Sequence, residues 1–130
     1  MAATRFTKEH EWIRTDAAAG VEATCGISDY AQKALGDIVY VELPPLGKQV
    51  KQGESVAVVE SAKAASEVYA PVDGEVIAVN DKLSSDPAKV NTSPAGDGWF
   101  FKLRISGPAQ LDALMDEAAY EKHIKGLLGS

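Results

Sequence analysis

The sequence predicts a mostly β protein built as a sandwich or a barrel. Three observations support this fold class: short runs rich in β-branched and aromatic residues recur along the chain, clusters of Gly and Pro separate them, and the spacing between them is close. A chain of 130 residues is expected to form one domain, residues 1–130, around one sizeable core.

The expected strands are runs in which β-branched or aromatic residues are enriched. They are Glu11–Thr15, Val21–Ile27, Ile38–Leu43, Val56–Glu60, Glu67–Ala70, Glu75–Asn80 and Trp99–Ile105. Turn residues separate them at 44–47, 73–74 and 94–98. Many short strands at such spacing are typical of sandwiches and barrels.

One short internal helix is expected at Asp29–Leu35. Ser28 precedes it and Gly36 follows it, and these residue types favour the beginning and the end of a helix. The helix bridges two strands, and its apolar face is expected to hold Ala31, Ala34 and Leu35.

Two short helices are expected at the C-terminus. Leu111, Leu114 and Met115 have helical spacing after Pro108, and Asp116 stands where a new helix would take its N-cap. The polar faces of both helices are acidic, so we expect them to cover the edge of the β core rather than a membrane.

The charge and cysteine content exclude several classes of function. The net charge is -6 and the isoelectric point is about 4.8, which argues against nucleic acid and anionic membranes as partners. The acidity either aids solubility or steers the chain toward a basic protein surface.

Cys25 is the only cysteine, so no internal disulfide or cysteine metal cluster is expected, and its apolar neighbours indicate a core position.

Neither a signal peptide nor a membrane span is predicted, because no apolar run approaches the roughly 20 residues that a span needs. The expected location is a reducing, soluble compartment. This is the bacterial cytoplasm or, if a transit peptide has been removed, the mitochondrial matrix.

Lys63 is the principal candidate for a functional residue. It lies in the six-residue connection Ser61–Ser66, which the flanking strands predict to be the turn of a hairpin. Its small neighbours leave the ε-amine open to a modifying enzyme, and acylation would remove its charge and add a reactive arm. The stretches before and after Lys63 have loosely similar residue patterns, which suggests two related sheets joined at this turn. The alternative is an ordinary solvated lysine.

The segment Glu60–Glu67, followed by Tyr69–Val76, resembles the lipoylation hairpin of the glycine cleavage system H-protein family. The resemblance continues in order along nearly the whole chain, through Glu9–Ile13, Gly26–Gln32, Leu35–Pro44, Val90–Pro94, Gly98–Lys102 and Leu114–Asp116. The hairpin alone would indicate only a lipoyl-like carrier, whereas the combination is specific. The chain departs from the family at 16–20, which is longer than usual, and at Cys25, where an aliphatic residue is more common.

The resemblance implies a barrel-sandwich hybrid of the lipoyl/biotinyl type, with lipoate joined to Lys63 by an amide bond. It also implies a monomeric carrier without turnover of its own. The carrier would accept an aminomethyl group from the glycine-decarboxylating pyridoxal-phosphate subunit and deliver it to the aminomethyltransferase. Dihydrolipoamide dehydrogenase would reoxidise it. A lipoylating enzyme is the further partner, and the residues expected to be recognised by it are Glu60, Ser61, Ala62 and Ala64.

The carried aminomethyl group is labile and is cationic when protonated, so a protected cleft with carboxylates suits it. In the family, the His-Glu-Trp segment and the acidic position four residues after the lysine help to form this cleft. The matching residues are His10, Glu11 and Glu67. We expect Glu11 and Glu67 to contact the amine, with His10 beside them; the alternative for each is a solvated side chain.

Four alternatives stay open at this point. Two are other carriers: a lipoyl domain of a 2-oxo acid dehydrogenase would normally lead into a linker and further domains, and a biotin carrier usually has methionines where Ala62 and Ala64 stand. A small enzyme using His10 and Glu11 is disfavoured, because adjacent residues on a regular strand point to opposite faces. An interaction module would need no modified lysine. No metal-ligand spacing is present.

Overall fold

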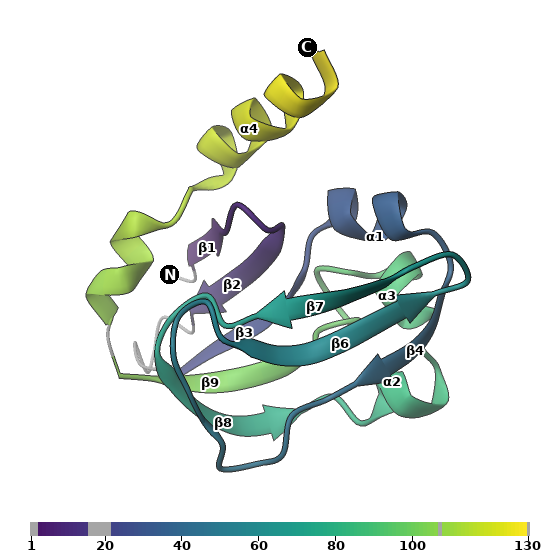
Figure 1. Cartoon of the computed structure of the whole chain (residues 1–130). Helices are drawn as coiled ribbons and strands as arrows, with labels where there is room; N and C mark the ends of the chain where they lie inside the picture. The colour runs from purple at the N-terminus through teal and green to yellow at the C-terminus, as the bar shows by residue number, and fades with distance from the viewer. Residues whose placement is uncertain (1–2, 16–21, 107, 130) are drawn as a thin grey trace.

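The structure is a computed structural model that describes residues 3–15, 22–106 and 108–129 (Figure 1). Within them, antiparallel strands form two sheets with the orders β1-β2-β3-β9-β8-β5 and β4-β6-β7. The strands are β1 (Ala3–Phe6), β2 (Glu11–Thr15), β3 (Glu22–Ile27), β4 (Ile38–Glu42), β5 (Gln49–Val50), β6 (Ser55–Ser61), β7 (Ala65–Tyr69), β8 (Gly74–Val79) and β9 (Phe101–Ile105). The mostly β fold class is confirmed.

The expected strands are present, with ends that differ by up to two residues, and the expected start at Val21 lies outside the described residues. The lengthened segment 16–20 also lies outside them. The sequence did not predict β1, a four-residue edge strand, or β5, which has two residues. It also missed the single-turn helices α2 (Lys82–Ser85) and α3 (Lys89–Thr92). Elements this short show too little periodicity to be recognised.

The core lies between the two sheets, and β9 shows the simplest pattern. Phe101, Leu103 and Ile105 are buried, while the residues between them are exposed. Cys25 is 1 % exposed in this core, as predicted. The outer face of β2 carries Trp12, which lies across Gly26 of β3; a Cβ at Gly26 would lie 2.9 Å from the indole ring, so only glycine fits there.

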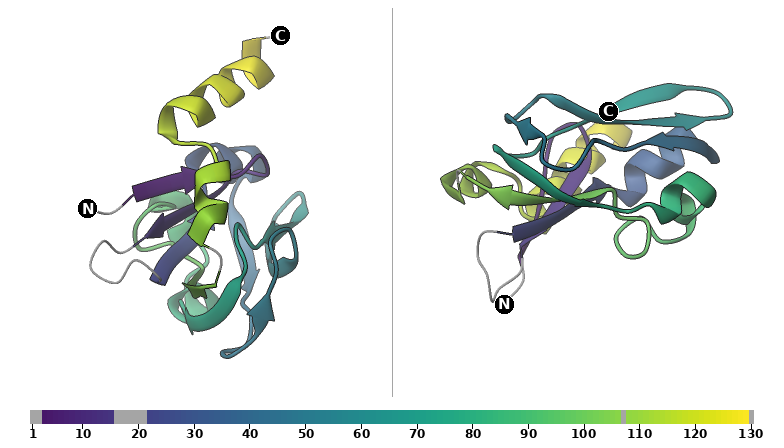
Figure 2. Two further views of the ribbon diagram at one scale, coloured as in Figure 1. Left: turned by 90° about the vertical axis from the view of Figure 1, so that its left-hand side faces the viewer. Right: turned by 90° about the horizontal axis from the view of Figure 1, so that it is seen from below.

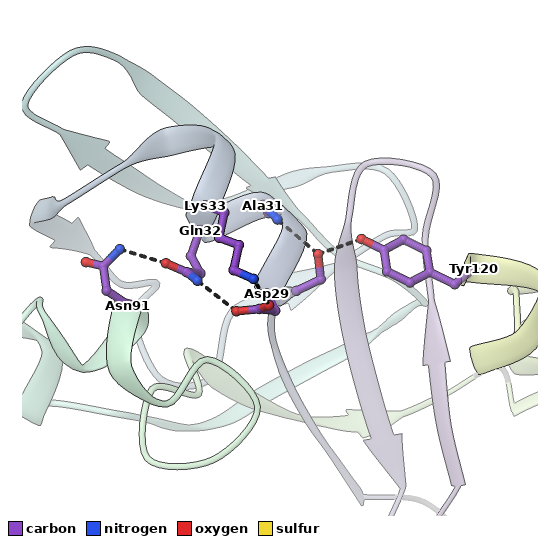
Figure 3. A network of polar contacts seen from close by, with 7 residues as sticks. Asp29, Ala31, Gln32, Lys33, Asn91 and Tyr120 are labelled. Atoms are coloured by element: carbon purple, nitrogen blue, oxygen red, sulfur yellow. Dashed lines mark hydrogen bonds and ion pairs between the residues drawn. The ribbon is translucent and has the colours of Figure 1, made fainter. Parts of the chain in front are cut away.

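The internal helix α1 (Asp29–Leu35) has the predicted bounds and caps. The Ser28 hydroxyl accepts a hydrogen bond from the Ala31 N–H at 3.2 Å, and Gly36 ends the helix with a φ of 87°. The predicted apolar face is wrong at Ala34, which is exposed, while Gln32 is buried. The cause is a polar contact, because the amide of Asn91 donates to the Gln32 side-chain oxygen at 2.9 Å (Figure 3).

The hairpin that carries Lys63 is tighter than the sequence predicted. Its turn has three residues, Ala62 to Ala64, because the ladder continues to the pair Glu60 and Ala65. The Ser61 N–H also donates to the Ala64 carbonyl at 2.7 Å. The expectation that this turn joins two related sheets is wrong, since β6 and β7 belong to the same three-stranded sheet.

The C-terminal segment forms a 3-10 helix, η1 (Pro108–Ala113), and then α4 (Glu117–Gly129), which at 13 residues is longer than the short helix expected. Asp116 caps α4 as predicted, accepting from the Ala119 N–H at 2.8 Å. Met115 pairs with Phe6 and Tyr120 of α4 stacks on Phe6, so both cover the edge at β1, whereas the C-terminal end of α4 extends away from the sheets (Figures 1 and 2). No helix in the described ranges is long and apolar enough to cross a membrane.

Candidate functional site: a hairpin lysine and an acidic cavity

Lys63 lies at the tip of the β6–β7 hairpin and is exposed. It forms no ion pair with the described residues of the chain. Its Cε lies beside Gly36, where a Cβ would be 3.5 Å away, an ordinary contact. The position therefore requires glycine because of its positive φ, and not because the lysine side chain leaves no room for a Cβ.

The Ser61 hydroxyl shapes the tip around the lysine. It accepts from the Lys63 N–H at 3.3 Å and the Ala64 N–H at 3.1 Å. Ala62 and Ala64 are exposed on either side of Lys63, and Glu60 pairs across the sheet with Tyr40 and Ala65. The residues expected to guide the lipoylating enzyme thus lie around the lysine, and its two immediate neighbours, Ala62 and Ala64, carry only methyl groups.

Glu11 is buried between the two sheets, with 2 % of its surface exposed. One carboxylate oxygen accepts from the Thr7 hydroxyl at 2.6 Å, and the other accepts from the Tyr69 N–H at 3.2 Å. Thr7 also accepts from the Glu11 N–H at 3.1 Å. Because Glu11 lies on β2 and Tyr69 on β7, this carboxyl group connects the six-stranded sheet to the three-stranded one.

Burial raises the pKa of Glu11 to about 7, since little water is left to solvate a charge. The bonds from Thr7 and Tyr69 oppose this rise, and the nearby Glu9 adds to it. The carboxyl group is therefore poised to change its protonation near neutral pH, and a cation that approaches it would favour its ionised form.

Glu11 opens into a cavity of about 250 Å³ beside the end of β7. Four stretches of chain form its sides: the β1–β2 connection, the turn before β6, the end of β7 and the segment between η1 and α4. The lining residues are Phe6, Thr7, Lys8, Glu9, Glu11, Gln52, Gly53, Tyr69, Ala70, Pro71, Ala113, Leu114 and Met115. The cavity is thus mostly apolar around one buried acid.

Glu67 lies outside this cavity, between it and Lys63. It is exposed, and its carboxylate accepts from the Tyr69 hydroxyl at 3.3 Å. Ala65, Glu67 and Tyr69 share one face of β7, and the rise along a strand puts Tyr69 about 13 Å from Ala65. A path along this face therefore runs from the hairpin tip, past Glu67, to the cavity.

Tyr69 was not assigned a role from the sequence, although it begins a stretch that resembles the family. It bonds both predicted acids, Glu11 through its backbone N–H and Glu67 through its hydroxyl. Thr7 was missed as well. The resembling stretches do not include it, and only the fold brings its hydroxyl to Glu11.

His10 does not line the cavity. Its backbone has a φ of 72°, and it precedes β2, which begins at Glu11. The argument that His10 and Glu11 point to opposite faces assumed that both lie on a regular strand, and this assumption is wrong for His10. Its Nδ1 lies 2.8 Å from the Tyr120 hydroxyl, and its ring contacts Tyr30 with centroids 4.6 Å apart. Burial and the nearby His123 lower the pKa of His10. His123 of α4 is half-buried beside this ring.

A larger hollow of about 580 Å³ lies between α1, β2 and α4. Its aromatic lining comes from Phe6, Trp12, Tyr30 and Tyr120, and its acidic residues, Asp29, Glu117 and Glu121, are exposed. It therefore lacks the buried carboxyl group that distinguishes the smaller cavity. Among the described residues, no group of three His, Cys, Asp or Glu side chains is placed to hold a metal ion.

Comparison with known proteins agrees with this geometry. The family model for the glycine cleavage H-protein matches residues 4–127. The glycine cleavage system H protein of Parvibaculum lavamentivorans is 57 % identical over 127 residues, covering 98 % of this chain and 99 % of that protein. The one from Rhodospirillum rubrum is 55 % identical over 124 residues, covering 95 % and 97 %.

The same relationship holds for three-dimensional structure. The crystal structure of a glycine cleavage system H protein from Mycobacterium marinum matches with a TM-score of 0.83 and 34 % identity, and the match covers 98 % of each chain. Since the family model and the relatives cover almost the entire sequence, the chain belongs to the glycine cleavage H-protein family.

Proposed function

We propose that this chain is a lipoyl carrier of the glycine cleavage system, modified at Lys63, and that it carries the aminomethyl group of glycine between enzymes. One observation carries the proposal: an exposed lysine at the tip of a tight hairpin shares a path along β7 with a buried acid in an apolar cavity. The chain itself is a substrate for each partner and has no turnover of its own.

The residues around Lys63 and Glu11 fit a lipoyl group and its cargo. Lys63 offers a primary amine for an amide bond, and the small residues beside it leave room for the enzyme that forms the bond. The cavity offers apolar walls for a hydrocarbon arm and the buried carboxyl group of Glu11 for an amine. When bound, lipoate supplies a disulfide that accepts the aminomethyl group.

Glu11 and Glu67 are proposed to contact the carried amine. An ionised Glu11 in a mostly apolar cavity attracts a cation more strongly than a carboxylate in water does. Glu67 lies along the path on β7, and Tyr69, bonded to both acids, holds them in one arrangement. The mostly apolar walls would limit the access of water to a bound group that water hydrolyses. His10 supports the turn before Glu11 rather than touching the cargo.

The proposed partners follow from this role. They are the glycine-decarboxylating pyridoxal-phosphate subunit, the aminomethyltransferase, dihydrolipoamide dehydrogenase and the lipoylating enzyme, the last recognising Glu60, Ser61, Ala62 and Ala64. We propose that the chain meets them as a monomer. Its relatives named above are bacterial, so we place this exchange in the bacterial cytoplasm.

The choice between this carrier and other lipoyl carriers is tested by reconstitution. The lipoylated chain is mixed with the glycine-decarboxylating subunit, labelled bicarbonate and glycine, and exchange of label into glycine is measured. We expect exchange that requires the chain and that a lipoyl domain of a 2-oxo acid dehydrogenase does not support. Exchange equal to that of the lipoyl domain, or acylation of this chain by the 2-oxo acid dehydrogenase, would refute the proposal.

A further inference from the structure

Tyr120 connects the C-terminal helix to three other parts of the molecule. Its ring stacks on Phe6 of β1, with centroids 4.3 Å apart and planes within 2°. Its hydroxyl lies 2.5 Å from the hydroxyl of Ser28, the N-cap of α1, a contact drawn in Figure 3. It also lies 2.8 Å from Nδ1 of His10. The side chain is 4 % exposed, so these bonds are made away from solvent, where leaving a partner unpaired is costly.

Two of the residues that contact Tyr120, Phe6 and His10, belong to walls of the Glu11 cavity or adjoin them. Phe6 lines the cavity and also holds its C-terminal wall, since its N–H donates to the Met115 carbonyl at 2.7 Å and its carbonyl accepts from the Met115 N–H at 3.0 Å. Only four residues separate Met115 from Tyr120. Tyr120 therefore anchors the chain shortly after the wall formed by Ala113, Leu114 and Met115, on the same Phe6 that pairs with this wall.

The second wall is the β1–β2 connection, which ends at His10. The His10 N–H donates to the Thr7 carbonyl at 3.1 Å, and this turn places the Thr7 hydroxyl on Glu11. His10 adopts a φ of 72°, a conformation that is unfavourable for a residue other than glycine and persists only when surrounding contacts hold it. The hydrogen bond to Tyr120 is one such contact.

We propose that Tyr120 is a positioning residue for the Glu11 cavity: from α4 it fixes the β1–β2 connection and the 113–115 wall, without touching the cavity itself. This inference rests on the proposed function in one respect only, namely that the cavity holds the carried aminomethyl group. The position of the two walls is a property of the unmodified chain and is measured separately.

The test compares Tyr120→Phe, which keeps the ring on Phe6 but loses both hydroxyl bonds, with Tyr40→Phe as a control on the outer strand β4. Amide hydrogen exchange is measured at Phe6 and Met115 and, for reference, at Leu103 of β9. The Glu11 side chain is titrated by carbon NMR. For Tyr120→Phe we expect exchange at Phe6 and Met115 to rise about fivefold, as the loss of one to two net hydrogen bonds implies, with Leu103 unchanged.

The titration distinguishes positioning from a loss of overall stability. If the walls shift, water reaches Glu11 and its pKa falls from about 7 toward the ordinary value. We expect this fall in Tyr120→Phe and not in Tyr40→Phe. Wild-type exchange at Phe6 and Met115, a uniform rise that includes Leu103, or an unchanged Glu11 titration would each overturn the proposal.

A third readout separates this inference from the proposed function. After lipoylation and loading with the aminomethyl group, the lifetime of the load is compared in the wild type, Tyr120→Phe and Glu11→Gln. We expect both variants to shorten it. If Glu11→Gln leaves the lifetime unchanged, the cavity's proposed cargo is wrong, whereas the exchange and titration results still decide whether Tyr120 fixes the walls.

Discussion

Lys63→Arg is expected to reduce glycine–bicarbonate exchange to the level measured without the chain. The substitution keeps the positive charge and most of the length of the side chain, but a guanidinium does not form the amide that lipoylation requires. Lys63 is exposed and in no ion pair with the described residues, so the fold should persist. Exchange is measured with purified variants after each has been treated with the lipoylating enzyme.

The matched control is Lys82→Arg, an exposed lysine of α2 away from the hairpin. It should support exchange at the wild-type rate. Residual exchange in Lys63→Arg that scales with the concentration of the variant would show that the chain transfers the aminomethyl group without a lipoyl arm on this residue.

Glu11→Gln is expected to shorten the lifetime of the loaded aminomethyl group on the order of tenfold, because a hydrogen bond to a charged group is worth about 1.5–3 kcal/mol. Glutamine retains the shape of the side chain and has an oxygen for the Tyr69 N–H, so the cavity is preserved. Release of the group is followed over time in the absence of the aminomethyltransferase. Glu117→Gln, an exposed acid on α4, is the control.

The ratio of wild-type to Glu11→Gln lifetimes should depend on pH, because only ionised Glu11 attracts the cation. The carried cation lowers the pKa of Glu11 below its value of about 7 in the unloaded chain, so the ratio should rise with pH over the range below about 7. The chemistry of hydrolysis itself cancels in the comparison. A ratio near one at every pH would remove Glu11 from the holding site.

The same raised pKa has a consequence for stability. A carboxyl group with a higher pKa in the folded chain than in the unfolded chain stabilises the fold fully below the unfolded value of 4.5, and this stabilisation is lost as the pH rises through about 7. The free energy of unfolding of the wild type should therefore fall by on the order of 2–3 kcal/mol across this range relative to Glu11→Gln. Urea titrations of both proteins measure the difference.

The elements that the sequence predicted well are those whose signals are local. Helix α1 was placed correctly because Ser28 and Gly36 mark its two ends. Strand β9 was recognised by its enrichment in β-branched and aromatic residues, although the predicted start at Trp99 is two residues early. The three-residue turn at Lys63 was not predicted. Ser66 and its small neighbours have weak strand preference, and it is pairing with β6 that extends β7 to Ala65.

The candidate site also has a part that could be predicted from local sequence and a part that could not. Lys63 and its neighbours form one continuous segment, so both their chemistry and their resemblance to a family are visible in the sequence. The cavity is built from four distant stretches, and the polar contacts in it and around it join residues far apart, such as Tyr69 with Glu11 inside it and Tyr120 with His10 outside it. Such contacts arise from sheet packing and leave no periodic signal in the chain.

The most direct test of the whole account is the mass of the intact wild-type chain after treatment with the lipoylating enzyme and a lipoyl donor, followed by mapping of its peptides. The account predicts one lipoyl increment, carried by the peptide that contains Lys63. An unchanged mass with an active enzyme, or an increment located on any other lysine, would contradict it.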